Sequence, residues 1–153
     1  MTSVVVVVAL GVMGGMASPA AVQVSPFAVS ACEADVAHTV KVHVPESFLA
    51  NGQLLAAGDY EMRVTTDHPE PAAGQSPAGE CWVEFVKAEV AVGREVASVI
   101  PDSGIADVAK APAPRPNSAR VEILKGGEYL RIWFNVDATN YLIHLPVAVA
   151  RRQ

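Results

Sequence analysis

Hydrophobic and polar residues alternate along most of the chain after residue 36, which is the period of a half-buried β-strand. In Thr39–Val44 the valines occupy one face, Lys41 and His43 occupy the other, and Pro45 ends the strand. The same alternation predicts further strands over 60–64, 80–87, 95–100, 120–124, 129–134 and 140–145. Turns are expected at Asn51-Gly52, 57–59, 93–94 and 125–128, and long loops over 66–79 and 101–118.

These segments predict an all-β fold. They amount to roughly seven or eight short strands joined by turns, a pattern typical of an antiparallel β-sandwich, Ig-like or jelly-roll-like. None of them has the period of a long helix. We expect the β-sandwich domain to span 36–150, after a signal peptide over 1–20 and an N-terminal arm over 21–35.

The N-terminal segment predicts export. It has no charged side chain before Glu33 and begins with the apolar run Val4–Leu10. Small residues follow at 17–21, as in a cleavable signal peptide, and the apolar stretch is shorter than the about 20 residues of a spanning helix. Residues 1–3 lack the usual Lys or Arg, so a retained anchor or a buried element stays an alternative. The predicted location is periplasmic or secreted.

Cys32 and Cys81 are the only cysteines. In an oxidising compartment a disulfide between them is favoured, and a bridge over a loop of about 50 residues stabilises a fold by about 4 kcal/mol in the chain-entropy model. Val29–Cys32 resembles a bacterial lipobox, so lipidation of Cys32 is the alternative, and two unpaired thiols are the third. A catalytic thiol is not expected, because neither cysteine neighbours a histidine or lies in a CxxC pair.

Net charge and the absence of known motifs reduce the number of function classes to consider. The net charge is −5 at pH 7, and a nucleic-acid partner is not expected because phosphate binding needs a basic face. The four histidines lack the spacing of a zinc or copper site, so no metal or other cofactor is expected. No nucleophile elbow or phosphate-binding glycine pattern is present, and the acidic residues lie on outward strand faces. The sequence therefore predicts a protein that is not an enzyme.

Aromatic residues are the candidate ligand contacts. Trp82 is out of phase with the inward residues of its strand, and Trp133 is likewise offset and shares a face with Tyr129. If both indole rings lie on one exposed face, they can stack on a sugar or a peptide. If a small second core covers that face, they are buried, and the pattern favours burial.

Residues 42–64 resemble an element of small exported β-rich bacterial proteins of unknown function. In that family a strand ending in Val-Pro is followed by Phe, a glycine turn and Leu-Pro-Ala-Gly-x-Tyr. Here Val44-Pro45, Phe48 and 55–60 follow this order, with Ala56 in place of the proline. The resemblance implies export and a β fold, and it implies no activity.

The expected function is therefore that of a non-enzymatic envelope or secreted β-domain that binds a protein or a glycan. The alternative is a lipoprotein with a structural role, which contacts the membrane only if Cys32 is lipidated.

Overall fold

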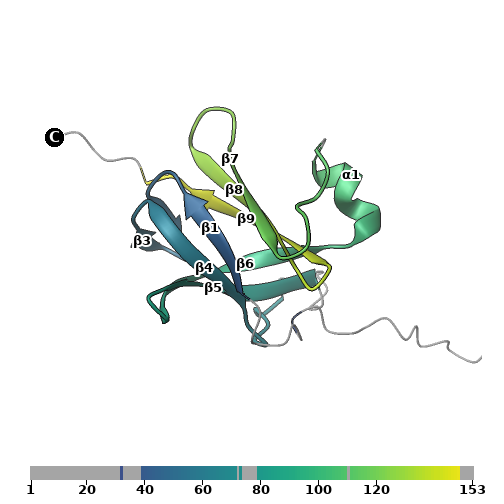
Figure 1. Ribbon diagram of the computed structural model, residues 1–153, viewed down its shortest axis with the longest axis horizontal. Helices are drawn as coiled ribbons and strands as arrows, with labels where there is room; N and C mark the ends of the chain where they lie inside the picture. The colour runs from purple at the N-terminus through teal and green to yellow at the C-terminus, as the bar shows by residue number, and fades with distance from the viewer. Residues whose placement is uncertain (1–31, 33–38, 72, 74–78, 110, 149–153) are drawn as a thin grey trace, which may run out of the picture.

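Strands dominate the part of the chain that the structure, a computed structural model, describes: Cys32 and residues 39–71, 73, 79–109 and 111–148. The strands are β1 (Thr39–Val44), β2 (Phe48–Ala50), β3 (Gln53–Leu55), β4 (Gly58–Val64), β5 (Glu80–Lys87), β6 (Val90–Ile100), β7 (Ser118–Ile123), β8 (Tyr129–Val136) and β9 (Thr139–Pro146). Two short helical elements, η2 (Asp102–Gly104) and α1 (Ile105–Val108), lie between β6 and β7 (Figure 1). The predicted β-rich, antiparallel class is confirmed.

One seven-stranded sheet makes up most of the fold. Its strand order is β1-β4-β5-β6-β9-β8-β7, and β2 and β3 form a separate hairpin. The two end strands, β1 and β7, contact each other, so the sheet is nearly closed into a barrel. The expected sandwich would divide the strands between two sheets. Here short turns keep most successive strands paired, and strand twist with a bulge at Phe85/Val86 curls the one sheet onto itself.

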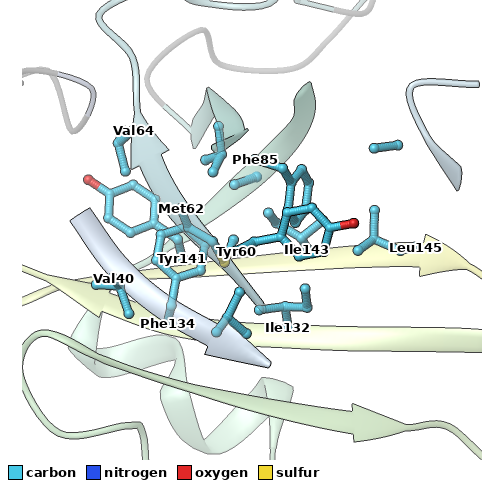
Figure 2. Packing of buried hydrophobic residues seen from close by; sticks show 14 of the residues in the cluster. Val40, Tyr60, Met62, Val64, Phe85, Ile132, Phe134, Tyr141, Ile143 and Leu145 are labelled. Carbon is cyan, nitrogen blue, oxygen red and sulfur yellow. The ribbon is translucent and has the colours of Figure 1, made fainter. Parts of the chain in front are cut away.

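The inner face of the curled sheet holds the hydrophobic core. In β4, Tyr60, Met62 and Val64 are buried, while the charged residues between them reach the outer face. Figure 2 shows these side chains against residues from β8 and β9, including Phe134 and Ile143. The inward residues of the alternating pattern therefore form one core, to which both halves of the seven-stranded sheet contribute.

The β2–β3 hairpin adds Phe48 to this core. The Phe48 ring centroid lies 5.8 Å from that of Tyr60 and 5.1 Å from that of Phe85, and Phe48 is fully buried. Aromatic pairs of this kind contribute about 0.5–1.5 kcal/mol beyond area burial. The predicted Asn51-Gly52 turn is confirmed, with φ of 45° and 79°. The element at 42–64 is thus a strand, a core-filling hairpin and the next strand.

The turn predicted at 93–94 is wrong. The chain turns at Ala88-Glu89, where φ is 50° and 64°, and β6 runs through Gly93 without interruption. A Cβ added at Gly93 would lie 2.8 Å from Leu55 Cδ1. The absence of a side chain at Gly93 therefore allows β3 to pack closely on β6. Besides its role in turns, glycine in a strand commonly allows such a close approach.

The β8–β9 turn tests how much backbone strain the fold carries. Asp137 and Ala138 have φ of 49° and 64°, a conformation that costs a side-chain-bearing residue about 1–2 kcal/mol. We predict that Ala138→Gly raises the free energy of unfolding in urea by up to about 1 kcal/mol, because glycine's added freedom in the unfolded chain offsets only part of the relief. The control is Ala91→Gly in extended β6, which should lower it by about 0.5–1 kcal/mol. Equal destabilisation by both substitutions would contradict the prediction.

Candidate functional site

The predicted disulfide is present and ties Cys32 to the strand β5. The Cys32 and Cys81 Cα atoms are 5.6 Å apart, and both residues are fully buried. The Cys32 Sγ also lies 3.3 Å from His68 Nδ1, in the loop after β4. The bridge therefore holds the residue that precedes the described domain against the sheet. Lipidation of Cys32 would modify the same sulfur atom that forms this disulfide.

The candidate aromatic residues do not form one exposed platform. Trp82 is on β5 and Trp133 on β8, and β6 and β9 lie between these strands in the sheet. Trp133 is only 1% exposed, which matches burial under a second layer. Trp82 is half-buried, and Arg94 Cζ lies 4.4 Å from its ring centroid. Tyr129 is 48% exposed at the start of β8. In this conformation Trp133 offers no surface to a ligand.

An open hollow of about 580 Å³ lies on the β1, β4 and β5 side of the sheet, and we call it the β1–β4–β5 hollow. Charged side chains from these three strands and from the turn after β5 line it: Lys41, His43, Asp59, Glu61, Lys87 and Glu89. Apolar Val42, Tyr60 and Val86 also contribute to its lining. Val42, Tyr60 and Val86 are only 6%, 4% and 4% exposed, so the accessible surface of the hollow is formed mainly by the charged residues, with both signs present.

Strand register explains why these charges converge. Lys41 lies opposite Glu61, and His43 lies opposite Asp59, so the pairs stand side by side across β1 and β4. His43 Nδ1 and Asp59 Oδ1 are 2.7 Å apart, but both side chains are largely exposed, so this pair adds little to stability. Lys87 Nζ lies 5.5 Å from the centroid of the Tyr60 ring. The alternation predicted outward faces for Lys41, His43 and Glu61 without indicating that their side chains meet.

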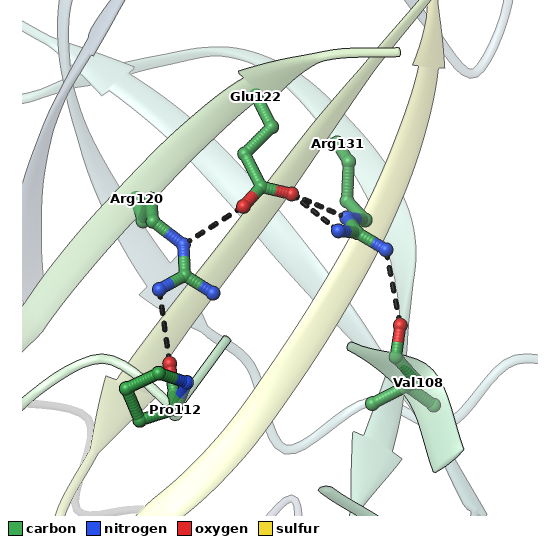
Figure 3. Close-up of polar contacts among 5 residues, drawn as sticks. All are labelled: Val108, Pro112, Arg120, Glu122 and Arg131. Atoms are coloured by element: carbon green, nitrogen blue, oxygen red, sulfur yellow. Dashed lines mark hydrogen bonds and ion pairs between the residues drawn. The ribbon is translucent and has the colours of Figure 1, made fainter. Parts of the chain in front are cut away.

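A second charged cluster lies on the outer face of β7 and β8 (Figure 3). Glu122 accepts hydrogen bonds from Arg131, with Nε at 2.8 Å, and pairs with Arg120 Nε at 3.0 Å. Arg131 Nη1 donates to the Val108 carbonyl at 3.1 Å, and Arg120 Nη1 donates to the Pro112 carbonyl at 2.9 Å. The cluster therefore fastens the chain between β6 and β7 to the sheet.

Comparison of the chain with protein-family models, curated proteins and solved structures gives no significant match. Within the described ranges, His, Cys, Asp and Glu side chains form no group of three or more that could bind a metal ion. Among the helices that the structure describes, none is both long and apolar enough to cross a membrane. The β1–β4–β5 hollow and the charged cluster on β7 and β8 are therefore the features that point to a function.

His144 gives the outer face a predicted pH response. It lies opposite Arg131 across β8 and β9, and partial burial together with the Arg131 charge lowers its pKa below 6.5. The unfolded chain then binds this proton more readily than the folded protein, so stability falls as the pH decreases through 6.5. We predict that His144→Gln reduces the loss of unfolding free energy between about pH 7 and pH 5, measured by urea denaturation. An unchanged slope in the variant would contradict this.

Proposed function

We propose that this protein is an exported, non-enzymatic binding domain that holds a protein partner in the β1–β4–β5 hollow. The observation that carries the proposal is the convergence of lysines and carboxylates from three strands and a turn at one concave surface. Ligand sites are typically concave, and polar groups at fixed positions orient what binds there. An extended peptide with charges of both signs complements this surface.

A protein partner fits the hollow better than a glycan does. Sugars are commonly held by exposed aromatic rings, and the Tyr60 residue that lines the hollow is only 4% exposed. Lys41 and Lys87 make no ion pair within the described part of the chain, so their ammonium groups are available to a partner's carboxylates. Glu61 and Glu89 offer the opposite charge to its basic groups.

Two observations support export, the sequence pattern of the N-terminal segment and the disulfide. The predicted signal peptide at 1–20, and the 21–35 arm apart from Cys32, lie outside the described residues, so the support there is the sequence pattern. The Cys32–Cys81 disulfide is compatible with an oxidising compartment. Because the same sulfur cannot be both bridged and lipidated, the disulfide favours the unlipidated form over the lipoprotein alternative.

Intact mass after expression of the full chain in bacteria tests this part of the proposal. We predict a periplasmic or secreted protein cleaved within or just after 17–21, whose mass rises by about two daltons on reduction as one disulfide takes up two hydrogens. A mature chain that begins at Cys32 and carries a diacyl mass increment would establish the lipoprotein alternative. An uncleaved chain in the cytoplasm would contradict export altogether.

Site-specific photo-crosslinking in the cells that produce the protein tests the hollow. A photoreactive residue at Glu89, on its rim, should yield a discrete protein adduct, and the same residue at exposed Lys125 should not. The double variant Lys41→Ala/Lys87→Ala should lower the adduct yield by roughly tenfold, since two charged contacts are lost. Lys125→Ala is the matched control and should leave the yield unchanged. Equal adducts from both positions, or none from Glu89, would contradict the proposal.

A further inference from the structure

Buried polar atoms without a hydrogen-bond partner gather on the outer face of β7 and β8. Within the described structure they are Trp133 Nε1, Asn135 Oδ1, Arg120 Nη2 and Arg120 Nε. Arg120 Nε lies 3.0 Å from Glu122 Oε1 in an ion pair, which leaves the other three atoms without any partner. Arg120 lies directly opposite Trp133 across the two strands, and Asn135 is two residues further along the same face. Trp133 and Asn135 are 1% and 5% exposed. Each such atom costs a folded protein about 1–3 kcal/mol unless a partner is supplied.

A weakly held segment covers this face. We call residues 101–109 and 111–117 the cover segment, and it contains η2 and α1 (Figure 1). Neither helical element has a buried residue or a side-chain cap. Four side chains of the sheet hold the cover segment by hydrogen bonds. Arg120, Arg131 and Ser118 donate to main-chain carbonyls of the segment, and Asn140 donates to Asp102 Oδ1 at 3.3 Å. A segment with so little buried apolar surface opens locally at low free-energy cost.

Two open hollows lie along the cover segment. One, of about 580 Å³, is lined by Glu122 and Arg131 of the sheet together with α1, and the other, of about 410 Å³, lies beside Asp102 and Pro112. Both touch Ala106, Ala109 and Ala111 of the cover segment. These small side chains leave room at each side of the segment. The larger hollow falls within the range of about 300–1,000 Å³ that is usual for small-ligand sites.

We propose that this face is a binding site for a neutral mono- or disaccharide, which takes the place of the cover segment on Arg120 and Arg131. Both guanidinium groups already hold neutral oxygen acceptors, the carbonyls of Val108 and Pro112. Sugar hydroxyl oxygens offer the same kind of acceptor. We call this face, with Trp133 at its centre, the Trp133 site.

The charges and the unpaired atoms select the ligand class. An anion at the Trp133 site meets the carboxylate of Glu122, which stays on the sheet when the cover segment is displaced, and a cation meets the guanidiniums of Arg120 and Arg131. An apolar ligand leaves the buried polar atoms without partners. A hydroxyl group both donates and accepts, so a polyhydroxylated ligand can accept from Trp133 Nε1 and Arg120 Nη2 and donate to Asn135 Oδ1.

Nuclear magnetic resonance of the full chain, with its disulfide formed, tests the Trp133 site directly. The indole N–H signals of Trp133 and Trp82 are followed while cellobiose, chitobiose, acetate or phosphate is added. We expect a saturable shift of the Trp133 signal with at least one of the two neutral sugars and no comparable shift of Trp82. A Trp133 signal that neither sugar moves, or that only acetate or phosphate moves, would overturn the proposal.

A matched pair of arginine variants distinguishes loss of the Trp133 site from the general effect of removing an arginine that stacks on a tryptophan. Arg120 Cζ lies 5.3 Å from the Trp133 ring centroid, and Arg94 Cζ lies 4.4 Å from that of Trp82. Arg120→Gln should weaken sugar binding by about tenfold, as expected for one charged hydrogen bond, and Arg94→Gln should leave the affinity unchanged. Equal weakening by both variants would overturn the assignment. If Arg120→Gln does not fold, the titration of the unsubstituted chain decides the question.

Because the Trp133 site and the β1–β4–β5 hollow lie on different strands, the two proposals fail separately. A sugar-dependent shift at Trp133 says nothing about crosslinking from Glu89, and loss of the Glu89 adduct leaves the Trp133 titration untouched.

Discussion

The fold depends on burying one face of a single sheet against itself. The apolar residues of β4 and β5 pack on Phe48 of the small β2–β3 hairpin and on those of β8 and β9 at the other end of the strand order. Each square ångström of apolar surface so buried contributes about 25 cal/mol, and this gain requires strong curvature. The bulge at Phe85/Val86 and the close approach of Leu55 to Gly93 accompany that curvature. Contact between β1 and β7 also shields edges that would otherwise be open to pairing with other chains.

The outer face of the curled sheet is covered in one half and open to solvent in the other. On β8 and β9 this face carries Trp133 and Leu142, which are too apolar to stay in water, so the chain between β6 and β7 folds over them. Main-chain carbonyls of that segment need donors, and the Arg120–Glu122–Arg131 cluster supplies them. A single surface ion pair contributes about 0–1 kcal/mol, but here one carboxylate orients two guanidiniums that each hold the cover.

On β1 and β4 the outer face carries charged residues and needs no cover. Its cross-strand pairs, Lys41 with Glu61 and His43 with Asp59, stay in contact with solvent. A concave, charged surface thus stands on one half of the barrel, and a covered, polar and aromatic surface stands on the other. The inner core connects the two surfaces, so both proposed binding sites belong to one domain.

Period-two alternation and turn chemistry determined the local structure from the sequence alone. The faces of β1, β4 and β8, the Asn51-Gly52 turn and the hairpin around Gly126-Gly127 follow from the residues themselves. The sequence favoured a Cys32–Cys81 disulfide but left lipidation and free thiols open, and the structure contains the disulfide. Alternation assigns a side chain to a face but does not say what lies against that face. The tertiary structure therefore decided that seven strands form one curled sheet in place of two stacked sheets, that Trp133 is buried while Trp82 is only half-buried, and that the hollow's charges converge. It also decided that Gly93 serves packing, because a glycine allows a turn and a close approach equally well until a distant residue such as Leu55 lies against it.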